Sequence, residues 1–439
     1  LFCCLCFLTG QELTISSSNA YLVEEFNTAK QMAYDYVVTG ADPEYIPAYW
    51  GSYPIRECFC SRDICHQAEA GHLLGLDLEN FSMLKTFASD APESNEYWPK
   101  WSYDFYGNPY FMDADFKELP APFEIVEKIY EQYLWTGDPN WIWDETLFTY
   151  CENTVTHFVN IHDQNQNGIV ELHTDLATYW EQETDDFIEA GDSFANQYRA
   201  VIAFAGVLAA RGDNSTADEY YQLAEQLQNQ HAVDWFDQDE NIYIRGFDAD
   251  GNYKTDFGHE NSFFMPMKLI TDLGTKTKHY VEFCHRSIAY PNGEDYTQWN
   301  FNQGINIEAK TYLPQMAYYN NRIAIGWHWL LNIMNSNSDY PEVPFLIVGH
   351  IVSSMMGLTP NAPNHKITTL SKLNYEVPWL QADNIVLGEN TFSLRHDGQT
   401  KSTMTHSNGP VLHWEAQFYG EFEQLMVDGE LVASEQKSA

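Results

Sequence analysis

A helical repeat of apolar residues limits the fold of this chain more than any other feature of its sequence. Leu22, Phe26, Ala29 and Ala33 recur at steps of three and four residues, and Gly40 then supplies a stop signal. By the same reasoning we expect about twelve helices. They cover residues 20–38, 62–75, 77–90, 121–136, 140–160, 185–211, 214–233, 258–273, 277–289, 307–320, 322–335 and 343–357. About twelve helices joined by alternating short and long connections favour six hairpins closed into an (α/α)6 toroid.

An open helical solenoid is the alternative architecture, and it requires self-similarity at a fixed period. The 214–233 segment resembles half of one helical repeat, but no matching recurrence follows it. After Pro360 the sequence alternates apolar and polar residues, with turn signals such as HDGQ and SNGP. We therefore predict a mainly α protein, with a toroid over residues 15–360 and a C-terminal appendage over residues 361–439. The appendage should be a small antiparallel β unit of about three or four strands, with strands only there.

The first ten residues, LFCCLCFLTG, are mostly apolar and give way to polar sequence. We interpret residues 1–14 as the remnant of a secretory signal peptide, which predicts a secreted or periplasmic protein. A buried first strand is the alternative, because short apolar runs are ambiguous. No later segment approaches the ~20 apolar residues of a membrane-spanning helix, so we expect no such helix.

The charge of the chain excludes some partners. Its 22 basic residues face 63 acidic ones, a formal net charge of −41 at pH 7, which repels nucleic acids and anionic lipid head groups. We therefore expect no nucleic acid partner. Aromatic residues make up 15% of the chain, and their flat faces suit stacking on sugar rings. An oligo- or polysaccharide substrate fits both observations, and the sequence leaves the oligomeric state open.

The run PIRECFCSRDICHQAEAGHLLGL, which begins at Pro54, concentrates polar residues on an apolar background. Arg56 and Arg62 are cations in a chain that has few of them, and arginine can bind a sugar carboxylate in a bidentate manner. Asp63, His66 and Gln67 follow on the same predicted helix, and we assign them to substrate binding as well. The alternative is that the two arginines form internal salt bridges with the acids beside them.

Two stretches raise the question of a metal. Cys58, Cys60 and Cys65 have the spacing C-x-C-x4-C, which lacks a second paired half and matches no usual structural zinc pattern. We expect no metal there and interpret these cysteines as small apolar fillers of a buried helix start. The loop DQNQNGIVELHTD imitates a calcium loop, but Thr174 stands where a bidentate glutamate is expected. We predict no cofactor, with a structural calcium ion in that loop as the open alternative.

Four acids are candidates for catalysis because they lie in or near helix starts in aromatic or apolar surroundings. Glu189 and Asp192 are three residues apart, so both carboxylates would share one helix face. Glu308 stands between apolar neighbours, where an acid needs a partner or has a raised pKa. We predict Asp192 or Glu189 as general acid and Glu308 as the second carboxylate, with Glu260 as a substitute. The ordinary alternative for such acids is helix capping.

Aromatic and histidine side chains near these stretches complete the predicted binding surface. They are Trp98, Trp101, Trp180, His259 and Tyr312. Tryptophan is usually well buried, so a position in the core is the alternative for each of the three.

Longer stretches of the chain resemble one known family. The segments IRECFCSRDICHQAEAGHLLGLDLENFSMLKTFA, DDFIEAGDSFANQYRA, IEAKTYLP and YPEVPFLIVGHIVSSMMGLTP are similar, in this order, to segments of bacterial six-hairpin glycoside hydrolases. The nearest group is the family-154 β-glucuronidases. The resemblance covers about residues 45–430 and implies an (α/α)6 barrel that acts on a glycan containing uronic acid. Paired carboxylates would then supply acid and base catalysis.

Two other functions remain open. A polysaccharide lyase would use Tyr312, His66 or His259 to abstract the proton beside a uronate, while an arginine or asparagine neutralises the sugar carboxylate. A glycan-binding protein without catalysis would need none of the candidate acids.

Overall fold

The computed structural model describes residues 12–39, 44–110, 115–173, 176–181, 183–289 and 305–437. Most of the predicted signal remnant and Thr174 therefore lie outside the described residues. The interpretation of residues 1–14 stays a prediction, as does the division of the chain at residue 360. Strand β1 (Thr14–Ser17) pairs with a strand of the C-terminal sheet, so the start of the described chain contributes to the β unit.

Six inner helices form a closed ring. They are α2 (Ser61–Leu73), α4 (Ala121–Thr136), α8 (Gly191–Ala210), α10 (His259–Met267), α12 (Ile307–Tyr319) and α14 (Glu342–Gly349). Each packs against the next in chain order, and α14 packs against α2. This closure confirms the predicted toroid and excludes an open solenoid.

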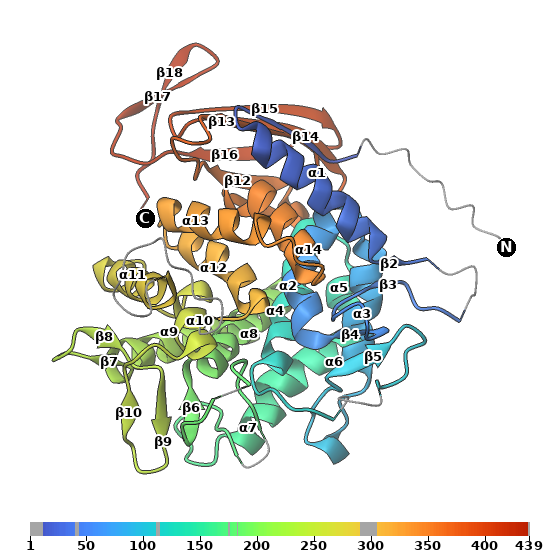
Figure 1. The fold of residues 1–439 in the computed structure, drawn as a ribbon, viewed down its shortest axis with the longest axis vertical. Helices are drawn as coiled ribbons and strands as arrows, with labels where there is room; N and C mark the ends of the chain where they lie inside the picture. The colour runs from blue at the N-terminus through green and yellow to red at the C-terminus, as the bar shows by residue number, and fades with distance from the viewer. Residues whose placement is uncertain are drawn as a thin grey trace.

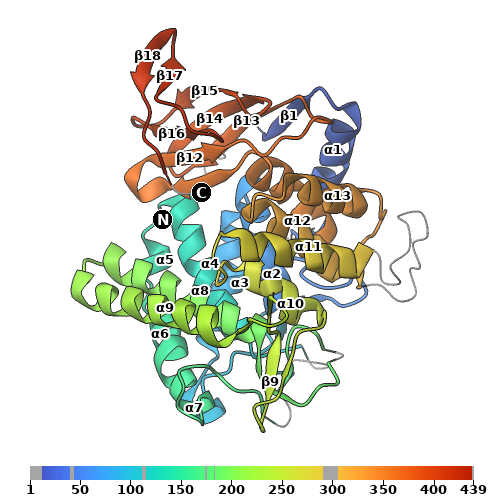
Figure 2. The same cartoon turned by 90° about the vertical axis from the view of Figure 1, so that its left-hand side faces the viewer.

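An outer layer of helices surrounds this ring (Figures 1 and 2). It consists of α1 (Ala20–Asp35), α3 (Asp77–Ser89), α6 (Glu145–Asn153), α9 (Asn214–Asp234), α11 (Thr275–Ala289) and α13 (Ile323–Met334). Helix α1 packs against α14, so the first helix of the chain completes the last hairpin. The predicted 140–160 helix is broken into α5 (Asn140–Trp143), α6, a π-helical turn η2 (Thr154–Phe158) and α7 (Val159–His162). A second π turn, η3 (His350–Ser354), extends α14.

The two layers differ in how much of each helix is buried. In α9 the buried residues Ala217, Ala224, Leu227 and His231 form one stripe, as an outer helix requires. In α2 nearly every residue is buried, charged residues included. Burial of charged groups is unfavourable unless they are paired, so the polar residues of α2 need partners inside the ring. Within the part of the chain that the structure describes, no helix is both long and apolar enough to cross a membrane.

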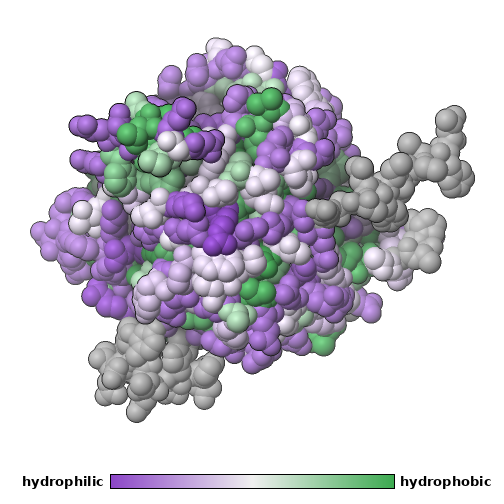
Figure 3. Space-filling view, turned by 90° about the horizontal axis from the view of Figure 1, so that it is seen from above, coloured by the Kyte–Doolittle hydropathy of each residue, from purple (hydrophilic) through white to green (hydrophobic). Residues whose placement is uncertain are grey.

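The C-terminal β unit is larger than predicted (Figure 1). One antiparallel sheet has the order β1–β13–β14–β15, with β13 (Trp379–Leu387), β14 (Asn390–Asp397) and β15 (Lys401–Asn408). A second sheet contains β11 (Leu358–Asn361), β12 (Lys366–Leu370) and β16 (His413–Gln417), and β12 and β16 run parallel. Strands β17 (Gln424–Val427) and β18 (Glu430–Ala433) form a separate hairpin. Seen from this end, the surface is mostly hydrophilic with separate apolar patches (Figure 3).

The prediction that strands occur only at the C-terminal end is wrong. Short strands also pair as β2 (Val37–Val38) with β3 (Ala48–Tyr49), β4 (Cys58–Cys60) with β5 (Ser102–Asp104), and β7 (Phe236–Asp237) with β8 (Ile242–Tyr243). A further sheet joins β6 (Phe187–Ala190), β9 (Gly246–Asp248) and β10 (Tyr253–Lys254). The helix predicted over 185–211 therefore begins only at Gly191. Strands β4 and β6 run directly into α2 and α8, so their pairing fixes where these inner helices begin.

Close packing of α8 on α10 leads to a stability prediction. A Cβ atom at Gly191 would overlap the carbonyl oxygen of Asn261 and come within 2.9 Å of Sδ of Met265. Gly191→Ala should therefore lower the free energy of unfolding by about 1–3 kcal/mol, the usual effect of overpacking. Gly349→Ala is the matched control, since its Cβ would lie at an ordinary 3.6 Å from Cβ of Ala70. Urea denaturation measures both, and equal stabilities for the two variants would contradict this account of the α8–α10 contact.

Candidate active site

Each of the six inner helices carries an acidic residue in its first turn. These residues are Asp63 in α2, Glu124 in α4, Asp192 in α8, Glu260 in α10, Glu308 in α12 and Glu342 in α14. The inner helices of such a ring run parallel, so their N-termini meet at one end of the barrel. The partial positive charge of a helix N-terminus stabilises a nearby carboxylate, which explains one acid at each start. It does not explain why nearly all of these side chains are buried together.

Arg62 is the cation at the centre of this cluster, and its side chain is only 6% exposed. Its Nη1 atom donates to Oε1 of Glu118 at 2.9 Å and to the carbonyl oxygen of Tyr179 at 3.0 Å. Its Nη2 atom forms an ion pair with Glu308 and lies 3.5 Å from Oε1 of Glu181. One guanidinium therefore contacts three carboxyl groups.

A second group of charges lies deeper in the barrel. Lys268 donates through Nζ to Glu124 at 2.5 Å and to Glu127 at 2.7 Å. Glu127 also accepts a hydrogen bond from Nε of Arg199 at 2.9 Å, and Nε2 of His66 lies 2.8 Å from Glu124. Burial alone would raise the pKa of both glutamates, but these partners outweigh it. The pKa of Glu127 falls to about 2 and that of Glu124 falls well below its usual value. The deep carboxylates are therefore ionised.

The carboxylates nearer the mouth behave in the opposite way. Burial, reinforced by neighbouring acids, raises the pKa of Asp63, Glu118 and Glu260 to about 8 each. Burial likewise raises the pKa of Glu308, while Arg62 acts against that rise. At neutral pH this end of the barrel therefore holds protonated and ionised carboxyl groups side by side, which general acid and base catalysis requires.

Tyrosine hydroxyls connect several of these acids. The hydroxyl of Tyr312 lies 3.0 Å from each oxygen of Glu342 and 3.5 Å from Oε1 of Glu308. Tyr340 donates a short hydrogen bond to Asp63. The hydroxyl of Tyr179 donates to Glu124 at 2.5 Å. These contacts hold each carboxylate in one orientation.

Glu260 differs from the other acids in one respect. Its side chain is buried, yet its Oε2 atom makes no hydrogen bond within the described part of the chain. Burial raises its pKa, Arg62 lowers it, and Glu308 and Asp192 add to the rise. A protonated carboxyl group with one unoccupied oxygen is suited to donate a proton to a substrate.

The two acids expected to supply the general acid have other contacts. Asp192 accepts hydrogen bonds from the backbone N–H groups of Tyr179 at 2.7 Å and Ser193 at 2.8 Å, and burial raises its pKa to about 7. Glu189 lies in β6 and accepts hydrogen bonds from the side chains of Asn165 and Asn167. Both side chains are therefore held by the protein itself. Their assignment as the general acid stays a prediction, and Glu260 has the better geometry.

The asparagine-rich loop owes its shape to these contacts. Asp163 accepts hydrogen bonds from the N–H groups of Asn167 and Gly168, and Glu171 accepts them from Gln164 and Asn165. Carboxylate oxygens that would bind calcium in a calcium loop thus accept hydrogen bonds from the loop's own backbone N–H groups. Among the described residues there is no group of three or more histidines, cysteines or acids that could hold a metal ion. Cys58, Cys60 and Cys65 are buried and form no disulfide bond among the described residues.

The remaining predicted binding residues lie in several places. Trp101 donates through its indole N–H to Glu118 at 2.5 Å and so supports the arginine cluster. Trp98 is buried against Phe158 and His162, and Gln67 donates to the backbone oxygen of Trp50. Arg56 lies half-buried in the turn before β4. Trp98 thus has the core position that was the alternative for it.

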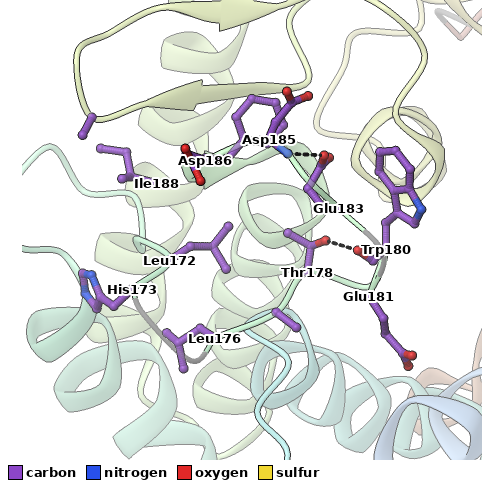
Figure 4. Close-up of a pocket in the computed structure, with 13 residues that line it drawn as sticks. Leu172, His173, Leu176, Thr178, Trp180, Glu181, Glu183, Asp185, Asp186 and Ile188 are labelled. Carbon is purple, nitrogen blue, oxygen red and sulfur yellow. Dashed lines mark hydrogen bonds between the residues drawn. The ribbon is translucent and has the colours of Figure 1, made fainter.

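Trp180 and His259 stack on each other with ring centroids 4.5 Å apart, so these two residues meet at the N-terminus of α10. Trp180 also lines a cavity of about 650 Å³ together with Glu181, Glu183 and Asp186 (Figure 4). Glu183 is held by Arg245 at 2.7 Å and by Asn261 at 2.8 Å. The cavity reaches the cluster through Glu181, which lies beside Arg62. Its acidic wall suits donors such as sugar hydroxyls.

Several residues of the cluster were not identified from the sequence, namely Glu118, Glu124, Tyr179, Glu181, Lys268, Tyr340 and Glu342. A simple signal would have found two of them. Glu124 and Glu342 are the first-turn acids of α4 and α14, and the same rule selects Asp63, Asp192, Glu260 and Glu308.

Comparison with known proteins establishes the fold. No family model matches the sequence, and no curated protein matches it. The structure resembles a GH78 family rhamnosidase of Bacillus sp. GL1, with a TM-score of 0.64 and 11% identity over 92% of this chain and 42% of that chain. It resembles a sialidase with a TM-score of 0.65 and 9% identity over 90% and 40%. A glycosidase variant solved in complex with glucose gives a TM-score of 0.54 and 11% identity over 75% and 96%.

The chain spans less than half the length of the rhamnosidase and the sialidase. At such low identities the likeness shows a shared fold, the helical toroid of solved glycosidases. The closer resemblance to family-154 β-glucuronidases stays a proposal.

The deep charges lead to a second stability prediction. Lys268→Met would leave Glu124 and Glu127 buried without their lysine, so we expect a loss of about 3–5 kcal/mol at pH 7. Because the pKa of Glu127 is lowered to about 2, its contribution is present above the unfolded pKa and disappears as the pH falls toward 2. The loss caused by Lys268→Met should therefore shrink in acid. Lys85→Met is the control, since Lys85 forms a partly exposed ion pair with Asp144 worth about 1 kcal/mol. A loss for Lys268→Met no larger than for Lys85→Met would contradict the account.

Proposed function

We propose that this protein is a glycoside hydrolase whose active site is the carboxylate cluster around Arg62. The observation that carries the proposal is that Glu308 and Glu260 stand at the starts of two neighbouring inner helices, with Glu308 paired to Arg62 and both residues acting on the pKa of Glu260. Hydrolysis of a glycosidic bond needs one carboxyl group to protonate the leaving oxygen and another to activate water or attack carbon. The fold shared with solved glycosidases supports the same reaction.

The roles follow from the charge states. Glu308 forms an ion pair with Arg62, which favours its ionised form, so it acts as the base or nucleophile. Glu260 has a pKa of about 8, so it carries a proton at neutral pH and acts as the general acid. Asp192, which lies near Glu260, adds to the negative field that keeps that proton in place. The reaction uses no group from outside the chain other than the glycan and water.

The sugar that the site accepts is the finer part of the proposal. A uronate is proposed because Arg62 is the central cation and its Nε atom makes no hydrogen bond to any described residue. Such a ligand has to compete with Glu118 and Glu308 for the guanidinium. A neutral sugar is the second candidate, because it leaves these ion pairs intact and the acidic wall of the neighbouring cavity suits hydroxyl donors.

A lyase is supported less well. Tyr312 is 1% exposed, and burial beside Glu342 raises its pKa well above the usual value, which disfavours the tyrosinate that would abstract a proton. Burial lowers the pKa of His66 and of His259 to about 4 each. His66 contacts Glu124, and His259 stacks on Trp180. Secretion or a periplasmic location is proposed on the apolar leader alone.

Incubation with aryl glycosides and uronic-acid glycans tests the proposed function. The panel should include aryl β-glucuronides, neutral aryl glycosides and polyuronates, with release of phenol and reducing ends as the readouts. Reducing ends without ultraviolet absorbance from a new double bond would support a hydrolase. Unsaturated products would establish a lyase. Binding without turnover on any substrate would favour a glycan-binding protein.

Substitution of the two carboxylates gives a prediction for the rate. Glu308→Gln and Glu260→Gln should each lower kcat by about 10²- to 10⁴-fold, the usual contribution of a general acid or base. The wild-type pH profile should be bell-shaped. Its alkaline limb should lie near pH 8, because the proton of Glu260 is lost there. This limb should be missing in any residual activity of Glu260→Gln. Near wild-type turnover in Glu308→Gln, with an unchanged melting temperature, would refute its role.

Arginine substitution separates the two candidate sugars. Arg62→Lys should raise KM for a glucuronide by about 10- to 100-fold, since lysine cannot make bidentate contacts with a carboxylate. The KM for a neutral glycoside should change much less, whereas kcat should fall for both because Glu308 loses its partner. Arg395→Lys in the β unit is the control. Arg395 pairs with Asp397 in β14, far along the chain from Arg62. An unchanged KM for the glucuronide would end the uronate proposal and leave the hydrolase proposal standing.

A further inference from the structure

Glu342 is one of the fully buried acids of the cluster, with 0% of its surface exposed. The hydroxyl of Tyr312 lies 3.0 Å from both of its oxygens, and Nδ1 of His66 lies 3.4 Å from its Oε1. The same Tyr312 hydroxyl lies 3.5 Å from Oε1 of Glu308. Tyr312 therefore stands between a fully buried acid and the carboxylate proposed to act on the substrate.

The contacts of His66 indicate which form of Glu342 fits. Nε2 of His66 lies 2.8 Å from Glu124, which Lys268 keeps ionised, so Nε2 carries the proton. Burial lowers the pKa of His66 to about 4, so the ring is neutral and its Nδ1 atom presents a lone pair. That lone pair faces Glu342. Nδ1 makes no hydrogen bond to a described residue, so an ionised Glu342 would bring a full negative charge against this lone pair, whereas a neutral carboxyl group would bring only an uncharged carbonyl oxygen.

The charges around Glu342 point the same way. Asp63 and Glu308 are its acidic neighbours, from α2 and α12, and both raise its pKa. Arg62, on α2, is the cation that acts on it, but Glu118 and Glu308 already share that guanidinium. Tyr312 from α12, Tyr340 just before α14 and neutral His66 from α2 complete the titratable groups that face it. Ionised Glu342 would have no cation of its own.

We propose that Glu342 is a neutral carboxylic acid at neutral pH and a positioning residue that, through the hydroxyl of Tyr312, directs a hydrogen bond to Glu308. This inference rests on the proposed role of Glu308. The carboxyl O–H of Glu342 donates to the phenol oxygen of Tyr312, and the phenol O–H is then available to donate to Glu308. An ionised Glu342 would instead accept the hydrogen bond of the phenol O–H and leave Glu308 without this donor.

Three variants test the direction of these hydrogen bonds. Glu342→Gln keeps a donor toward Tyr312 and should retain turnover within a few-fold. Glu342→Leu removes the donor and should lower kcat by about 10- to 100-fold, the effect of one lost hydrogen bond to a charged group. Tyr312→Phe should raise the pKa of the acidic limb of the kcat profile, because ionised Glu308 loses a donor. Tyr318→Phe is the control on the same helix, since the hydroxyl of Tyr318 makes no hydrogen bond to a described residue.

Infrared difference spectroscopy supplies a readout that does not depend on turnover. The wild-type protein at pH 7 should show the carbonyl band of a protonated carboxylic acid that is absent from Glu342→Gln. If no substrate is found but this band is present, the protonation state of Glu342 stands and only the proposed reaction fails. The inference is overturned if the band is absent. It is also overturned if Glu342→Gln is as inactive as Glu308→Gln, or if Tyr312→Phe leaves the acidic limb in place.

Discussion

The convergence of six helix N-termini on one end of the barrel is the constraint on which the rest of the structure depends. Closing a ring of parallel inner helices brings their partial positive charges together. Every inner helix carries an acid in its first turn, and a carboxylate there interacts favourably with these partial charges. Six acids in one small volume then repel each other, so each needs a proton, a cation or a hydrogen-bond donor. Arg62 forms an ion pair with Glu308, and Lys268 forms one with Glu124.

These two ion pairs mark two levels with different protonation states. At the deep level Lys268 and Arg199 keep Glu124 and Glu127 ionised, which ties α4 to α8 and to the end of α10. At the upper level burial dominates, and Arg62 cannot neutralise all of its neighbours. The same residue type therefore stabilises the fold at one depth and can exchange protons at another. Environment alone separates the roles, as in other enzymes that use paired carboxylates.

The architecture could be predicted from the sequence because it depends on local periodicity. The stripe of Leu22, Phe26, Ala29 and Ala33 is buried in α1 as its spacing indicates. The β6 strand was missed because its residues precede the helix start at Gly191 without a break in the apolar pattern, and only pairing with β9 makes them a strand. The size of the β unit was underestimated for the same reason, since β12 and β16 pair across some forty residues of chain.

The candidate site was predictable only in part. Glu308 stood out as an acid between apolar neighbours, Arg62 as one of few cations in an acidic chain, and Glu260 as an acid at a helix start. The partners of Arg62 did not, because Glu118 lies in a loop 56 residues away and contacts it only in the folded chain. Lys268 is 144 residues from Glu124, so no local pattern links them. In the sequence, each helix-start acid could be compared only with a helix-capping role. Their common role depends on the ring of helices, which brings them together only in the folded chain.

A crystal structure with a bound, thio-linked oligosaccharide that cannot be hydrolysed would test the central claim most directly. The account predicts that the sulfur of the glycosidic link lies beside the Oε2 atom of Glu260, with the anomeric carbon facing Glu308 and the sugar extending past Glu181. An oligosaccharide bound elsewhere on the protein, with Arg62 and its carboxylates still out of contact with it, would contradict the assignment of this cluster as the active site.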